Sequence, residues 1–226
     1  TILSQYTSAV LVLRVLLRTQ EDYRLELKNF VFSWEKAQRI LALGITSGLQ
    51  HAIFAMANLF IQSAVNTFSA AVVEGNSAAA NADSLVYEVM AAPYTACSTF
   101  ISQNYGAHNK ERIQKAYRVS LVYSFGVGAV LGLALMFFGG GFLRIFTPDP
   151  EVIAAGMEKL HIMGWSYAFS AFMDNSLAAS RGLGKSAVPV AIVILGSCVF
   201  RVIWVYTIFA MFHTLTSLYL LYIFSW

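Results

Sequence analysis

Residues 99–118, TFISQNYGAHNKERIQKAYR, lie between two long apolar stretches of the chain. Gly106 stands where the first stretch ends, at a position where a helix C-terminus favours glycine. Four basic residues follow before the next apolar stretch begins: Lys110, Arg112, Lys115 and Arg118. Two membrane-length segments joined by a short basic turn are typical of a transmembrane helical hairpin with its loop in the cytoplasm. This stretch predicts an all-α, polytopic transmembrane helical bundle.

The composition of the whole chain agrees with a membrane protein. Hydrophobic residues make up 58% of the 226 positions, charged residues only 12%, and the mean hydropathy is +0.62. An ordinary soluble domain carries about twice that charged fraction. The charged residues also cluster between long apolar runs, which excludes an ordinary soluble enzyme or binding domain.

The basic residues are concentrated on one side of the expected topology. Twelve of the fifteen lysines and arginines lie in or beside three segments: residues 19–38, 104–115 and 181–186. The positive-inside rule places all three in the cytoplasm. This distribution explains the net charge of +3 without a nucleic-acid partner.

Apolar runs predict five full crossings and parts of two more. The expected segments are 2–17 (a helix end), 40–73, 84–103, 116–138, 152–179, 189–212 and 215–226. The polar stretch 74–83, EGNSAAANAD, is predicted to be an outer loop, and Gly139–Gly141 and 147–150 are predicted to break the helix at the outer face. Gly128 and Gly132, in small-xxx-small spacing, would permit close contact between helices.

Three stretches carry a resemblance to a known family. The pattern F-x-x-Q-N-x-G-A at 100–107, followed by a basic helix start, resembles the loop between the eighth and ninth helices of multidrug and toxic compound extrusion (MATE) transporters of the MOP flippase superfamily. Residues 143–153 (LRIFTPDPEVI) and 180–189 (SRGLGKSAVP) agree in order and spacing.

The resemblance implies a fold of two six-helix lobes that face each other across a central cavity. It implies that residues 1–18 are the end of the sixth helix, that 19–38 form a cytoplasmic amphipathic interlobe linker, and that 39–226 form the C-terminal lobe with its last helix truncated. The N-terminal lobe of the same protein would then be a partner of this chain, together with membrane lipids.

The function implied by the resemblance is an ion-coupled antiporter in the cell membrane, driven by H⁺ or Na⁺, that exports cationic or amphipathic drugs by alternating access. The alternative is a lipid-linked oligosaccharide or polysaccharide flippase of the same superfamily. A flippase cavity needs many cations for pyrophosphate, whereas Arg201 alone among the basic residues is expected in mid-span, which favours the antiporter.

Ionisable residues inside the expected spans are functional candidates because burying a charge in lipid is costly. Asp174, beside Asn175 and one helical turn from Ser170, could bind a proton, Na⁺ or a cationic substrate, or be a structural carboxylate. Glu88 and Arg201 fall at similar depths, and a structural ion pair between them is the favoured interpretation.

Amide side chains recur along one face of the segment that begins at residue 40. They could line a drug path or bond neighbouring helices, and cavity lining is favoured. The residues are Gln50, Asn58, Gln62 and Asn66.

In one branch of the family, a glutamate of the seventh helix and an aspartate of the tenth form a cation site. The resemblance places Phe54 at the glutamate position and Ser170 near the aspartate position, so that site is incomplete here.

Enzymatic function is not predicted. Residues 179–186, ASRGLGKS, match a relaxed phosphate-binding pattern, but no strand precedes them and Pro189 with an apolar run follows, so a tight cytoplasmic turn fits better. The sequence has no HExxH, no GxSxG and no paired intramembrane carboxylates. Cys97 and Cys198 offer no disulfide or metal-ligand spacing, and we expect no cofactor beyond the coupling ion.

Overall fold

The computed structural model describes residues 2–21, 24–26 and 31–226. Over these ranges every regular element is a helix, which confirms the all-α prediction. The helices are α1 (Ile2–Arg18), α2 (Trp34–Val65), α3 (Ala70–Gly106), α4 (Lys110–Leu143), α5 (Pro150–Gly182), a continuous helix from Ala187 to Phe212, and α9 (Leu215–Ser225).

The chain divides into two units, Thr1–Leu41 and Ala42–Trp226, with the division inside α2. In the first unit, none of the residues of α1 is buried. The amphipathic character predicted for 19–38 involves residues 22–23 and 27–30, which lie outside the described residues, and it stays a prediction. The helix α2 begins at Trp34, before the predicted end of that linker.

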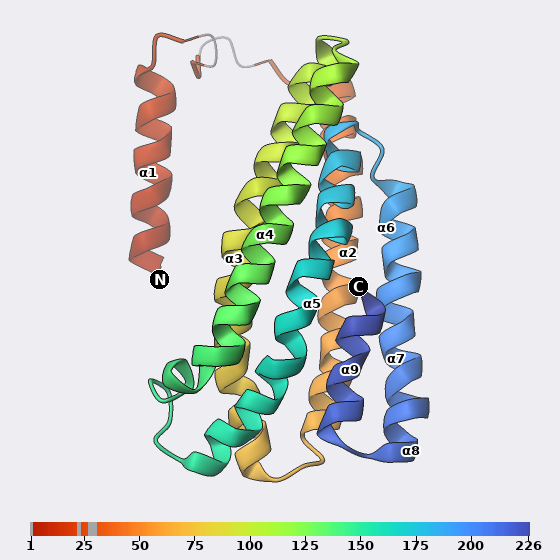
Figure 1. The fold of residues 1–226 in the computed structure, drawn as a ribbon. Helices are drawn as coiled ribbons and strands as arrows, with labels where there is room; N and C mark the ends of the chain where they lie inside the picture. The colour runs from red at the N-terminus through yellow and green to blue at the C-terminus, as the bar shows by residue number, and fades with distance from the viewer. Residues whose placement is uncertain (1, 22–23, 27–30) are drawn as a thin grey trace. The chain divides into compact units, whose positions relative to one another are not determined.

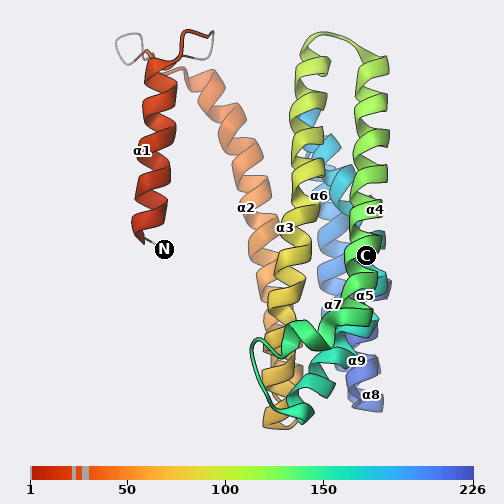
Figure 2. The same ribbon diagram turned by 60° about the vertical axis from the view of Figure 1, so that its left-hand side comes forward.

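The second unit is a helical bundle in which α3, α4 and α5 pack side by side along most of their lengths (Figures 1 and 2). Glycines make this packing close. A Cβ atom added at Gly132 would lie 2.1 Å from the carbonyl oxygen of Gly164, so the backbones of α4 and α5 are in direct contact there. Gly128 lies in the same way against the carbonyl of Tyr167, as the small-xxx-small spacing predicts.

On the other side of α5, α9 packs against α5 and against the helix 187–212. The second half of α2 joins this group through side chains rather than close backbone contact. Its residues Ile61, Ala64 and Val65 form one buried apolar cluster with Phe209, Leu218 and Leu221.

The outer loop predicted at 74–83 is wrong. The helix α2 ends at Val65, residues 66–69 make the connection, and α3 starts at Ala70 and runs through the whole stretch. The alanines of this stretch are good helix formers, and Ala79 and Ala82 are buried. The small residues of this stretch, which suggest a loop by composition, instead allow α3 to pack closely on α5.

Two further boundaries differ from the sequence prediction. The run Gly139–Gly141 does not break α4, which continues to Leu143, because Gly139 packs against Leu160 and Met157 of α5. After α3, the left-handed conformation is adopted by His108, with φ of 56°, and not by Gly106, which is the last helical residue.

Three of the described helices are long and apolar enough to cross a membrane: α2, α4 and Ala187–Phe212. The last is divided into α6 (Ala187–Val193), α7 (Phe200–Trp204) and α8 (Ala210–Phe212) by two π-helical segments, Ile194–Val199 and Val205–Phe209. The helices α3 and α5, at 37 and 33 residues, exceed the bilayer thickness but are more polar. Some of their polar side chains, such as Asn76, Asp83, Lys159 and Asp174, line the cavity described next.

Candidate functional site

A cavity of about 460 Å³ lies within the second unit, between α2, α3, α5, α7 and α9. Each helix contributes at least one polar or ionisable side chain, and α2, α3 and α5 also contribute apolar ones. The polar and ionisable lining residues are Gln50, His51, Asn58, Gln62, Asn76, Asp83, Ser84, Tyr87, Lys159, Asp174, Arg201 and Tyr222. Such a mixture in the middle of a bundle of apolar helices is typical of a substrate or ion path.

Three of the four amide residues singled out in the sequence form one wall of this cavity. Gln50, Asn58 and Gln62 line the cavity. Asn66 does not, because α2 ends at Val65 and Asn66 lies exposed just beyond it. Its side chain accepts a hydrogen bond of 2.9 Å from Gln62.

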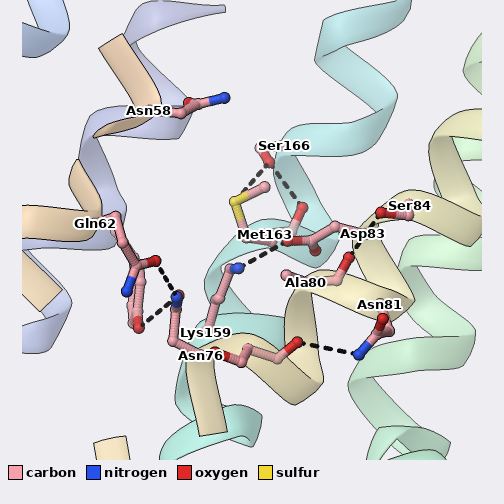
Figure 3. A network of polar contacts seen from close by, with 12 residues as sticks. Asn58, Gln62, Asn76, Ala80, Asn81, Asp83, Ser84, Lys159, Met163 and Ser166 are labelled. Atoms are coloured by element: carbon pink, nitrogen blue, oxygen red, sulfur yellow. Dashed lines mark hydrogen bonds and ion pairs between the residues drawn. The ribbon is translucent and has the colours of Figure 1, made fainter. Parts of the chain in front are cut away.

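Gln62 also joins α2 to α3 and α9. Its side-chain oxygen accepts a 3.2 Å bond from Asn76 of α3, and Asn76 accepts a 3.3 Å bond from the hydroxyl of Tyr219 of α9. Figure 3 shows Gln62 and Asn76 turned toward each other from their two helices. The amides therefore serve both as cavity wall and as bonds between helices.

A buried ion pair that the sequence analysis did not predict lies beside these amides. Lys159 Nζ of α5 is 2.9 Å from Asp83 Oδ2 of α3, and the two side chains are 6% and 15% exposed. Tyr167 of α5 donates its hydroxyl proton to the other oxygen of Asp83. Asp83 and Lys159 both line the cavity, and Figure 3 shows the ion pair between them. The predicted outer loop includes Asp83 and so excludes this pair, whereas the alanine-rich composition of 77–82 is the sequence signal for a helix there.

Arg201 of α7 is the second buried cation and has different partners. It is 2% exposed. Its Nε donates to Ser225 Oγ at 3.0 Å, and its Nη1 donates to Asn58 Oδ1 at 3.4 Å. Its guanidinium carbon lies 4.8 Å from the ring centre of Tyr222 and 5.6 Å from those of Phe54 and Trp226. Cation–π contact and neutral acceptors thus surround this charge.

The ion pair expected between Glu88 and Arg201 is not formed. The ion pairs in the described part of the chain are Arg39–Glu35 and Lys159–Asp83. Glu88 is exposed, whereas its neighbour Tyr87 lines the cavity. Residues five apart on a helix, as Asp83 and Glu88 are, point in clearly different directions, so α3 can turn only one of these carboxylates to the cavity.

Of the three residues predicted to act together, only Asp174 lines the cavity. Ser170, one turn earlier on the same side of α5, and Asn175 are both fully buried. Asn175 Oδ1 accepts a 2.5 Å bond from Ser120 of α4, and Ser170 donates to the carbonyl of Tyr167 at 2.8 Å. These two polar residues bond within the helix bundle and do not extend the cavity site.

Asp174 is the second carboxylate that lines the cavity. Among the described residues it forms no ion pair, in contrast to Asp83. Arg181, two turns further along α5, donates to Gln50 of α2 at 2.8 Å and contributes positive potential at Asp174. Over 2–21, 24–26 and 31–226, no three His, Cys, Asp or Glu side chains come together as a metal site.

Comparison with known proteins identifies the family. The family model described as MatE matches residues 47–207. The chain is 24% identical over 192 residues to the probable multidrug resistance protein NorM of Thermotoga maritima, covering 85% of this chain and 41% of that protein. It is 28% identical over 151 residues to the probable multidrug resistance protein YpnP of Bacillus subtilis, covering 66% and 34%.

Solved structures show the same fold. A MOP superfamily transporter from Pyrococcus furiosus superposes with a TM-score of 0.89 at 20% identity, over 100% of this chain and 51% of that one. An outward-facing multidrug resistance MATE family transporter superposes with a TM-score of 0.87 and the same coverage. The chain thus spans less than half the length of its curated relatives and about half that of the solved chains. It belongs to the MatE family, whose model covers well over half of its residues.

Proposed function

We propose that this chain forms one lobe of an ion-coupled antiporter, driven by H⁺ or Na⁺, that exports cationic or amphipathic organic molecules. The observation that carries the proposal is the open carboxylate of Asp174 on a cavity wall of amides and aromatic rings. The carboxylate can hold a proton, Na⁺ or a cationic group, while the amides accept varied substrates because they offer hydrogen bonds without a fixed charge.

Transport follows from alternating access in the proposed mechanism. The second lobe closes the cavity, and the loaded protein changes between states that open to opposite sides of the membrane. An ion shifts this equilibrium only by its difference in affinity for the two states. A carboxylate that binds the proton or Na⁺ more tightly in one state than in the other supplies that difference.

The flippase alternative requires cations that are free to bind pyrophosphate. The charge of Lys159 is neutralised by Asp83, and Arg201 is covered by aromatic rings. These contacts favour the antiporter.

We propose a multi-pass topology in the plasma or inner membrane with residues 19–38, 104–115 and 181–186 in the cytoplasm, supported by their basic residues.

The test uses the full-length parent protein in efflux-deficient cells and a fluorescent cationic dye. Wild type is compared with Asp174→Asn, while the proton and Na⁺ gradients are collapsed separately. Glu88→Gln is the matched control, since it makes the same acid-to-amide change at an exposed site that does not line the cavity.

We expect extrusion by wild type to require one of the two gradients, Asp174→Asn to lose at least nine tenths of it, and Glu88→Gln to keep it. Normal extrusion by Asp174→Asn would refute the role of Asp174. Absence of dye extrusion by well-expressed wild type would contradict the antiporter and favour the flippase.

A further inference from the structure

A second hollow of the molecule lies between α3 and α4, with a volume of about 460 Å³. It shares no lining residue with the cavity described above. It exists because Ala96 and Cys97 of α3 face Ala116 of α4, and these short side chains leave the space between the helices unfilled. Cys97 Sγ lies 3.8 Å from the carbonyl oxygen of Ala116, so the two helices meet at the floor of the cleft.

The cleft is long, narrow and mostly apolar. Its lining on α4 extends from Arg112 to Tyr123, which are about 16 Å apart along a helix. Phe100 of α3 and Tyr123 of α4 line it and are 59% and 65% exposed. Walls of this kind, on the outside of a membrane helix pair, suit an extended hydrocarbon chain.

Positive charge gathers at one end of this cleft. Arg112 and Lys115 line it near the loop between the two helices, together with the amide of Asn104. None of the lining residues is acidic. In the part of the chain that the structure describes, neither Arg112 nor Lys115 forms an ion pair. Two cations without an ion-pair partner therefore lie at one end of an apolar cleft.

We propose that this cleft binds an anionic phospholipid, with the phosphate between Arg112 and Lys115 and one acyl chain along the apolar wall toward Tyr123. The arrangement of charge and apolar surface matches that of the lipid, an anion joined to a hydrocarbon chain. Basic pockets between transmembrane helices on the cytoplasmic side bind anionic head groups in this way. The inference rests on the cytoplasmic orientation of 104–115 proposed above, and is independent of the transported substrate.

The experiment measures how many lipid molecules the detergent-purified, full-length parent protein retains in native mass spectrometry. Phosphatidylglycerol and phosphatidylcholine are offered in separate titrations. Arg112→Gln/Lys115→Gln is compared with Lys110→Gln/Arg118→Gln. The second pair is the matched control, because it removes the same charge from the same helix at positions that do not line the cleft.

We expect wild type to bind phosphatidylglycerol at least tenfold more tightly than phosphatidylcholine, and Arg112→Gln/Lys115→Gln to lose this preference. The control pair should stay within twofold of wild type. Equal losses in both pairs would show that general surface charge attracts the lipid, and would overturn the proposal.

A third variant tests the acyl chain separately. Ala116→Leu fills the cleft without changing any charge, and should weaken phosphatidylglycerol binding about as much as the charge pair does. An excess of inorganic phosphate should not displace the lipid. Full binding by Ala116→Leu, or displacement by phosphate, would mean that the site holds a phosphate alone and would refute the lipid assignment.

Discussion

The two buried cations of the cavity, Lys159 and Arg201, are accommodated in different ways. Lys159 has a carboxylate at 2.9 Å, and Asp83 is held in turn by the hydroxyl of Tyr167. Arg201 has two neutral hydrogen-bond acceptors and three aromatic rings. An ammonium group is a compact, strongly hydrated charge, whereas a guanidinium is delocalised, planar and weakly hydrated. The chemistry of each cation therefore decides whether it needs an acid inside the bundle.

Because the two cations have different partners, we expect substitutions at the two sites to lower the stability of the protein by different amounts. Removing the partner of Lys159 leaves a charge buried without compensation. Removing Arg201 itself leaves behind only an amide, a hydroxyl and rings, none of which carries a charge. The first change should therefore cost more free energy of unfolding than the second.

The largest effect is expected for Asp83→Ala. Removing one member of a buried ion pair typically costs about 3–5 kcal/mol, because the other charge remains in a low-dielectric environment. Thermal unfolding in detergent should show the lowest midpoint of the variants discussed here. The double variant Asp83→Ala/Lys159→Met should recover much of the loss; a double variant less stable than Asp83→Ala would contradict the account.

Arg201→Met should have an intermediate effect. It removes hydrogen bonds from a charged donor but also removes the cost of burying that charge, for a net loss of about 1–2 kcal/mol. The same unfolding measurement applies. A loss of stability as large as that of Asp83→Ala would indicate that Arg201 compensates a negative charge. It would contradict the conclusion that Arg201 has only neutral partners.

Asn58→Ala should have the smallest effect, about 0.5 kcal/mol or less. Its bond to Arg201 is long, at 3.4 Å, and the side chain is exposed to the cavity side of the bundle. Gln62→Ala serves as a comparison, since Gln62 bonds both Asn66 and Asn76. If Asn58→Ala proved the more destabilising of the two, the neutral acceptor would be a main support of Arg201.

The sequence was informative where the signal is local. Apolar runs placed the later helices, and the spacing of Gln50, Asn58 and Gln62 placed all three on the cavity wall because one helix fixes their common face. Asp174 was recognised as an ionisable residue within an apolar run. That Ser170 and Asn175 are buried and do not line the cavity depends on how the neighbouring helices pack on α5, which spacing alone does not show.

Predictions failed where the answer depends on contacts between distant residues. The stretch 74–83 mixes polar residues typical of a loop with alanines that favour a helix, and the packing of its small residues on α5 cannot be seen in the sequence. An outer loop over 74–83 excludes Asp83 as an intramembrane acid, so the sequence leaves Glu88 as the apparent partner for Arg201. The pairing of Asp83 with Lys159 joins residues far apart in the chain, and only the packing of α3 on α5 brings them together.

The order of these residues along the chain has a consequence for synthesis into the membrane. A lysine or arginine at the centre of an inserting helix costs about 2.5–3.5 kcal/mol on insertion scales. The helix α3 is made before α5, so Asp83 is already present when Lys159 arrives. Arg201 bonds to Asn58 upstream and to Ser225 downstream. We therefore expect the charge of Lys159 to be accommodated during insertion, and that of Arg201 only after α9 has emerged.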